Sequence, residues 1–177
     1  MELNQLIFRF LFSLGGRWPL VDEVVIFSAV WLGYVLGLLL VGFFVWRFYR
    51  RDEVAGTAAA SVVGAALAAW IFSAVVKFWY LAPRPFAFYA DLSPLFRYGF
   101  LDSFPSGHTI VAFAAAVAAR QFYPRFGNFV LVLALMIGLS RVIAGVHWPL
   151  DVLAGLLFGA FLGWLIPHLG PVRRQLS

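Results

Sequence analysis

Long uncharged apolar segments dominate this chain of 177 residues and constrain its fold more than any other feature. Hydrophobic residues make up 63% of the sequence and charged residues 12%. Soluble proteins have about 45–50% apolar and about 25% charged residues. Because a helix needs about 20 mostly apolar residues to cross a bilayer, the chain has room for about five crossings. We therefore predict an all-α integral membrane helical bundle, with residues 1–177 forming a single domain.

Five segments have the composition of a membrane-crossing helix: residues 24–46, 54–76, 106–122, 129–142 and 150–166. The last three are short, so we expect an interfacial segment or local bilayer thinning to compensate. Residues 80–104 are rich in proline and aromatics and too irregular for hydrocarbon unless protein shields them. They are predicted to form the one long loop.

Small residues recur every four positions in two of these segments, a spacing typical of close helix packing in lipid. One row lies in the second segment and one in the fifth. Their members are Gly56, Ala60, Gly64 and Ala68, and Gly155, Gly159 and Gly163.

The first 18 residues favour a helix lying on the membrane surface over a signal peptide. They contain an arginine within the apolar part and no small-residue cleavage pattern. The predicted helix is amphipathic, because apolar residues recur at helical spacing. Its apolar face carries Leu3, Leu6, Ile7, Phe10, Leu11 and Leu14.

Basic residues alternate between the two predicted ends of the bundle and set its orientation. At the end that carries the long loop, basic and acidic residues, Asp91 among them, balance. The other end has an excess of cations and is predicted to be cytoplasmic. Its basic residues are Arg47, Arg50, Arg51, Arg120, Arg125, Arg173 and Arg174. This dispersed charge argues against a nucleic-acid partner. The absence of cysteine excludes disulfides and thiolate metal ligands, and we expect no metal or cofactor.

Three separated stretches deliver polar groups to the predicted outer end. They are residues 77–85 ("KFWYLAPRP"), residues 105–108 ("PSGH") and residues 140–151 ("SRVIAGVHWPLD"). A lysine or arginine deep in a spanning helix costs about 2.5–3.5 kcal/mol and therefore needs a partner or polar cavity. Three cations near two histidines would repel one another, so an anion of about two charges, such as a phosphate monoester, is the expected ligand.

The residue types in these stretches suit phosphoryl chemistry. Pro105 is expected to open the third helix, whose free N–H groups would point at an anion. Ser106 adds a donor and Gly107 allows close backbone approach, while His108 has an ordinary pKa near 6.5, useful for a general acid. His147 and Asp151 are four residues apart, so the carboxylate can orient one ring nitrogen and leave the other to attack phosphorus.

The motifs K-x6-R-P, P-S-G-H and S-R-x5-H-x3-D occur complete and in this order between residues 77 and 151. In these motifs the chain resembles the type 2 phosphatidic acid phosphatases, the membrane relatives of vanadium haloperoxidases. The resemblance implies a metal-independent phosphatase with a phosphohistidine intermediate. His147 would be the nucleophile, Asp151 its orienting partner and His108 the general acid. The residues implied to hold the phosphoryl oxygens are Lys77, Arg84, Ser106, Gly107 and Arg141.

The substrate favoured by the compact chain is undecaprenyl diphosphate, since little structure outside the bilayer is left to hold a large sugar headgroup. Phosphatidylglycerol phosphate, phosphatidate and lipid A are alternatives within the family. An anion-binding scaffold or transporter is a hypothesis of another class, and a vanadate-dependent peroxidase a third. The expected location is a bacterial inner membrane, with the site facing the periplasm or exterior. Outside the motifs, Asp102 is expected to cap the third helix or face water. No oligomeric state is predicted.

Overall fold

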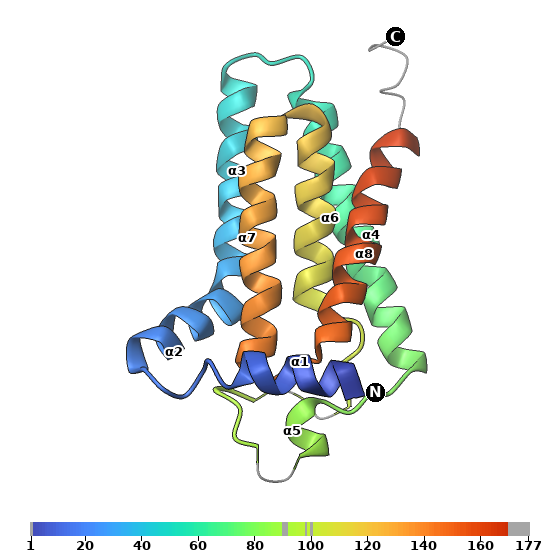
Figure 1. Ribbon diagram of the computed structural model, residues 1–177. Helices are drawn as coiled ribbons and strands as arrows, with labels where there is room; N and C mark the ends of the chain where they lie inside the picture. The colour runs from blue at the N-terminus through green and yellow to red at the C-terminus, as the bar shows by residue number, and fades with distance from the viewer. Residues whose placement is uncertain (1, 90–91, 98, 100, 170–177) are drawn as a thin grey trace.

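The computed structural model describes residues 2–89, 92–97, 99 and 101–169, and every regular element within these ranges is helical (Figure 1). Four helical stretches in this part of the chain are long and apolar enough to cross a membrane: Pro19–Tyr49, Ala55–Trp79, Pro124–Ile143 and Pro149–Leu169. The predicted all-α membrane bundle is thereby confirmed. The elements are α1 (Glu2–Phe12), α2 (Pro19–Ile26), the π-helix η1 (Phe27–Trp31), α3 (Leu32–Tyr49), α4 (Ala55–Trp79), α5 (Pro85–Phe88), α6 (Gly107–Phe122), α7 (Pro124–Ile143) and α8 (Pro149–Leu169).

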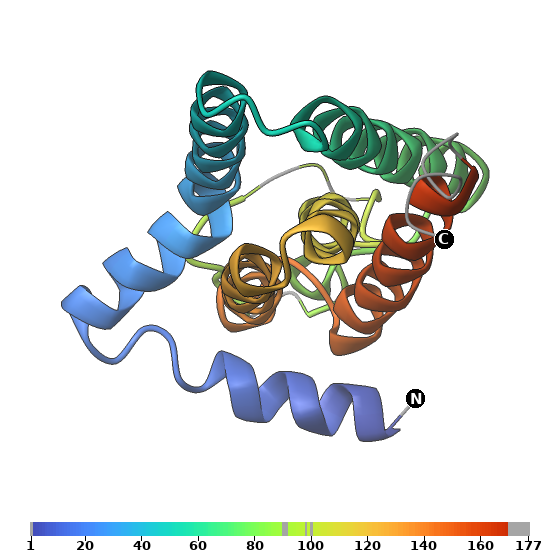
Figure 2. The ribbon, with the colours of Figure 1, turned by 90° about the horizontal axis from the view of Figure 1, so that it is seen from above.

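Helix α6 occupies the centre of the bundle, between α4, α7 and α8 (Figure 2). Its 16 residues make it the shortest of the upright helices, about 24 Å long at 1.5 Å per residue. Much of it is alanine with little or no exposure, and the small side chains let three neighbours approach its axis. The flanking helices α7 and α8, with 20 and 21 residues, are longer than the segments predicted for them.

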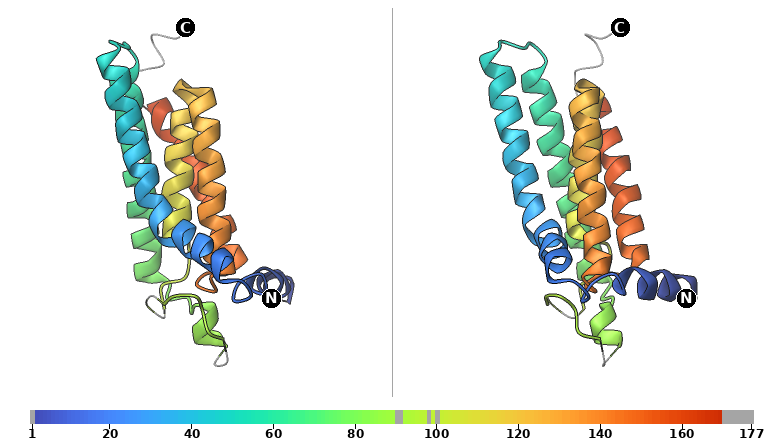
Figure 3. Two further views of the ribbon diagram at one scale, coloured as in Figure 1. Left: turned by 90° about the vertical axis from the view of Figure 1, so that its left-hand side faces the viewer. Right: turned by 60° about the vertical axis from the view of Figure 1, so that its left-hand side comes forward.

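The first crossing is bent, which the sequence analysis did not predict. Residues 24–46 were predicted to cross the membrane as the first span, and the π-helical turn η1 interrupts the helix there. Helix α2 leans away from the bundle and α3 continues upright (Figure 3). A π turn carries an extra residue and shifts the register of the helix after it, so it is a common origin of such bends. Hydropathy identifies the apolar segment but gives no sign of the π-helical turn within it.

The two predicted rows of small residues have different outcomes. On α8, Gly155, Gly159 and Gly163 are buried against α6, as predicted. On α4, the predicted row is wrong: Ala60 is exposed and the others are half-buried. The buried stripe there follows spacings of three and four residues, the period of a helix seam. It includes Ala55, Ala58, Val62, Ala65 and Ala69.

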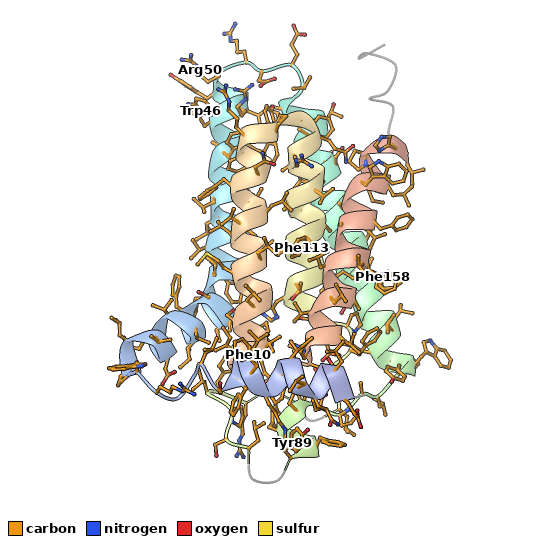
Figure 4. The ribbon with its side chains drawn as sticks, viewed as in Figure 1. Phe10, Trp46, Arg50, Tyr89, Phe113 and Phe158 are labelled. Atoms are coloured by element: carbon orange, nitrogen blue, oxygen red, sulfur yellow. The ribbon has the colours of Figure 1, made fainter. Side chains whose placement is uncertain are left out.

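The two ends of the bundle carry different groups, as the side-chain view shows (Figure 4). Trp46 and Arg50 lie at one end, while Phe10 and Tyr89 lie at the other, where α1 and α5 cover the helix ends. The C-terminal ends of α4 and α7 and the N-terminal ends of α6 and α8 all meet at this second end (Figure 1). Asp91, Arg173 and Arg174, which entered the charge comparison, lie outside the described residues.

Candidate active site

All eight predicted site residues lie at the end of the bundle covered by α1 and α5. They come from four helix ends and two connecting segments, far apart along the chain. Lys77 is in the last turn of α4, Arg84 precedes α5, Ser106 precedes α6, Gly107 and His108 begin α6, Arg141 is in the last turn of α7, His147 lies between α7 and α8, and Asp151 is in the first turn of α8.

The His147 ring is fully enclosed, with only 1% of the residue exposed, and its two nitrogens face different groups. Nε2 lies 3.3 Å from Arg84 Nη1 and 3.4 Å from Arg141 Nη2. Nδ1 lies 3.4 Å from Asp151 Oδ2. A neutral ring with its proton on Nδ1 satisfies both sides, since Nε2 then presents a lone pair to the two guanidinium groups.

Burial keeps this ring neutral. His147 lies in the segment between two helices, and burial lowers its pKa well below the ordinary 6.5, with the charges of Arg141 and Arg84 lowering it further. A neutral imidazole is the form that can act as a nucleophile. The same cations that oppose a proton on the ring would attract a phosphate dianion beside it.

Ser103 belongs to the site although the sequence analysis did not identify it. Its Oγ donates a short hydrogen bond to Asp151 Oδ2 and lies 3.5 Å from His147 Nδ1. The backbone N–H of Trp148 donates to the same carboxylate oxygen at 2.9 Å. These two donors fix the carboxylate that faces the histidine. No spacing rule could reveal Ser103, because its partner lies 48 residues further along the chain.

Of the two places predicted for Asp102, a cap on the third helix and a position facing water, the structure supports the second. Asp102 does not cap α6, whose N-cap residue is Ser106. Its Oδ1 accepts a hydrogen bond from Arg84 Nε at 3.0 Å, while the side chain stays 47% exposed. Burial alone would raise the pKa of Asp102, but the hydrogen bond and charge of Arg84 outweigh it and leave the pKa below its ordinary value. Asp102 therefore holds Arg84, which also donates to the Val146 carbonyl at 2.7 Å.

The start of α6 forms the second wall of the site. The helix begins at Gly107, two residues after Pro105, which was expected to open it, and Ser106 makes no side-chain cap. A Cβ at Gly107 would lie 3.7 Å from Lys77 Nζ, which places the ammonium group beside this turn. The described residues include no group of three or more His, Asp or Glu placed to hold a metal ion. The donors converging here suit an anion.

An apolar groove of about 890 Å³ leads away from this wall. It lies between α3 and α4, and residues of α6 also line it. Along α4 its lining runs from Lys77 to Ala59, about 27 Å at the helical rise. This length approaches the hydrocarbon thickness of a bilayer. Ser73, Lys77, Gly107 and His108 line its polar end, and the rest is apolar, including Leu36, Gly37, Leu40, Phe44, Val62 and Ala66.

Comparison with known proteins places the chain in a family. The family model described as "PAP2 superfamily" matches residues 57–175, which include all three motifs. The chain belongs to the PAP2 superfamily. This membership confirms the resemblance inferred from the motifs.

The chain is also similar to individual proteins and to a solved structure. The "Bacitracin transport permease protein BcrC" of Bacillus licheniformis is 33% identical over 99% of this chain and 87% of its own length. The "Putative undecaprenyl-diphosphatase YbjG" of Escherichia coli is 31% identical over 89% of this chain and 78% of its own. The crystal structure of Aquifex aeolicus LpxE matches with a TM-score of 0.75 and 28% identity, covering 93% of this chain and 94% of that one. Family and fold together make this chain a multi-pass membrane lipid phosphatase.

Proposed function

We propose that this phosphatase removes the terminal phosphate of undecaprenyl diphosphate through a phosphohistidine on His147. The observation that carries the proposal is the enclosed imidazole between two guanidinium groups and a carboxylate. It lies near Lys77 and His108, which line the polar end of a long apolar groove. This arrangement supplies a nucleophile, charge for a phosphoryl group and space for a lipid chain.

The first half-reaction transfers the phosphoryl group to the protein. His147 Nε2 attacks the terminal phosphorus, and the bond from phosphorus to the bridging oxygen breaks. His108 donates a proton to that oxygen, and undecaprenyl phosphate leaves. Arg84, Arg141 and Lys77, with the Ser106 hydroxyl and the Gly107 N–H, hold the phosphoryl oxygens. Asp151 stabilises the cationic ring of the phosphohistidine, and such positioning with charge stabilisation accounts for most of phosphoryl-transfer catalysis.

The second half-reaction regenerates the histidine. A water molecule attacks the phosphorus of phosphohistidine and passes a proton to His108, and the bond from phosphorus to Nε2 breaks. Inorganic phosphate leaves, and His147 returns to the neutral form that its burial favours. The cycle restores both histidines to their starting protonation states.

The substrate preference rests on the groove and on relatives. One continuous groove suits one long hydrocarbon chain, and the compact chain offers little surface for a sugar headgroup. A relative from Bacillus subtilis, 26% identical over 92% of this chain, is named "Undecaprenyl-diphosphatase BcrC". We place the protein in a bacterial cytoplasmic membrane with the site facing outward, in accord with the excess of arginine at the opposite end.

Phosphate release from a panel of purified lipids in the presence of a chelator tests the proposal. The panel contains undecaprenyl diphosphate, phosphatidylglycerol phosphate, phosphatidate and lipid A. We expect the highest kcat/KM for undecaprenyl diphosphate and full activity in chelator. Higher kcat/KM for another lipid would contradict the substrate assignment, and loss of activity in chelator would contradict the metal-independent mechanism. A His147→Ala variant that keeps its function would support an anion-binding or transport role.

Single cysteines test the orientation, because the natural chain has none. Ser93→Cys lies in the long loop at the site end, and Glu53→Cys lies in the turn at the opposite end. A membrane-impermeant thiol reagent added to intact cells should label the first and spare the second. The reverse pattern would place the site on the cytoplasmic side.

A further inference from the structure

Helix α1 lies across the ends of α7 and α8, at the end of the bundle that holds the site (Figures 1 and 2). Phe8, on one face, is fully buried. Leu3, Leu6 and Phe10, on the other face, are more than 60% exposed. Because residues four apart share a helix face, Asn4, Phe8 and Phe12 form one row directed at the bundle.

Each member of this row contacts a residue close to His147. The Phe12 ring packs so near Gly145 that a Cβ there would lie 2.8 Å from Phe12 Cε2. The Phe8 ring lies 5.1 Å from the Trp148 ring, centroid to centroid. Asn4 Oδ1 accepts a hydrogen bond from the Leu150 N–H at 3.1 Å. Three successive turns of α1 thus follow the segment from residue 145 to residue 150, which contains the nucleophile.

The middle of this segment is held by weak backbone hydrogen bonds. Gly145 has a positive φ of 80°, and the amides of Val146 and His147 share one acceptor, the Arg141 carbonyl, at 3.2 and 3.3 Å. On its other side the segment is held by the Arg84 hydrogen bond to Val146 O and by the Trp148 Nε1 hydrogen bond to Pro83 O. Helix α1 therefore adds contacts at Gly145, Trp148 and Leu150 to those that hold the segment from the long loop.

Placement of the nucleophile matters because a displacement of about 1 Å can cost on the order of 100-fold in rate. The exposed apolar face of α1 suits insertion at the boundary of the bilayer. We propose that α1 is a membrane-seated positioning helix, which uses Asn4, Phe8 and Phe12 to hold the His147 segment in its reactive position. The proposal rests on His147 as the nucleophile and is independent of which lipid is the substrate.

The test compares two phenylalanines of the same helix. Phe8→Ala removes the ring that packs on Trp148, and Phe10→Ala removes one that is 66% exposed. Phe8→Leu keeps most of the apolar volume. We measure kcat and KM on a long-chain lipid phosphate and on a short-chain soluble phosphate, normalised to folded protein. Phe8→Ala should lower kcat about tenfold on both substrates with KM nearly unchanged, Phe8→Leu should recover most of it, and Phe10→Ala should match the natural protein.

Several outcomes overturn the proposal. Equal kcat for Phe8→Ala and Phe10→Ala would do so, as would a change confined to KM or to the long-chain lipid. Should Phe8→Ala not fold, Asn4→Ala with Gln5→Ala as its control makes the same comparison, with a smaller expected loss of kcat. His147→Ala separates this proposal from the proposed function. If it stays active, the nucleophile assignment fails; if it is inactive and Phe8→Ala is normal, only the role of α1 fails.

Discussion

The α6–α8 and α3–α4 interfaces use glycine in opposite ways. At the α6–α8 interface, a Cβ on Gly159 or Gly163 would lie 2.4 Å from a carbonyl oxygen of α6, so the two backbones are in direct contact. On α3, a Cβ at Gly37 would meet nothing within 4 Å, and Gly37 instead lines the apolar groove. The same residue type permits close packing in one place and leaves space in the other.

This difference separates the two tasks of the proposed reaction. Asp151 lies in the first turn of α8, on the closely packed side, where its carbonyl accepts a hydrogen bond from the Ser106 N–H at 3.1 Å. His147 lies in the segment just before α8. The groove lies on the side where two helices stand apart, so a flexible hydrocarbon chain can enter from the bilayer. The closely packed α6–α8 interface thus lies next to the proposed reacting atoms, and the open groove between α3 and α4 would hold the part of the lipid that does not react.

The largest expected effect comes from the closely packed side. His147→Ala should lower kcat by at least about a thousandfold, because it removes the proposed nucleophile while the fold is retained. His168→Ala, at the far end of α8, is the matched control and should keep normal activity. Single-turnover phosphate release measures both. A His147→Ala variant within tenfold of the natural protein would remove the assignment of chemistry to this side.

A second prediction compares the glycines directly. Gly159→Ala should lower the free energy of unfolding by about 1–3 kcal/mol, because the new methyl group overlaps the Ile110 carbonyl oxygen. Gly37→Ala should leave it unchanged or raise it by up to about 1 kcal/mol, since alanine favours a helix more than glycine does. Thermal unfolding in one detergent measures both variants. Equal losses would show that the two interfaces are packed alike.

Filling the groove should affect the substrate chain alone. Gly37→Trp places a large ring in the groove and should raise the KM for a long-chain lipid phosphate about tenfold, while a short-chain soluble phosphate is unaffected. Gly42→Trp, on the same helix and outside the groove, controls for the loss of glycine. Steady-state kinetics on both substrates measure the change. An equal effect of the two variants would mean that the groove does not hold the chain.

The smallest expected effect is on stability in acid. The pKa of His147 in the folded protein lies below 6.5, so below about pH 6.5 the unfolded chain binds a proton that the folded chain does not. The free energy of unfolding should therefore fall as the pH drops below about 6.5, by up to about 1.4 kcal/mol per pH unit for this group. Above about pH 6.5 this group makes no contribution to the pH dependence. Thermal unfolding at pH 7.5 and 5.5 should show a smaller acid loss for His147→Gln than for His168→Gln. Equal losses would contradict the burial argument.

Much of the fold and the named site could be predicted from the sequence. Apolar runs show where helices cross, because the bilayer demands long uncharged segments. Because successive crossings alternate in direction, four helix ends meet at one end of the bundle, and this places Lys77, His108, Arg141 and His147 together. The bend at η1 could not be predicted, because residues 24–26 directly before it and Leu32 directly after it are all apolar.

The supporting contacts were beyond the reach of sequence patterns. Ser103 and Asp102 act on residues 48 and 18 positions away, and such distances have no helical or strand period. The amphipathic character of α1 was predicted, and its exposed apolar residues agree with that prediction. Phe8, however, was not on the predicted face. Its burial depends on Trp148, a tertiary contact that local spacing cannot reveal.

The adjacency of Asp102 and Ser103 has a consequence for how such a phosphatase can evolve. Asp102 holds Arg84, a proposed phosphate ligand, and Ser103 holds Asp151, the proposed partner of the nucleophile. Because these two residues are adjacent, a shift of this short segment should change substrate affinity and turnover together. Natural variants that alter headgroup preference should consequently arise elsewhere, in the groove or the long loop, where one property can change without the other.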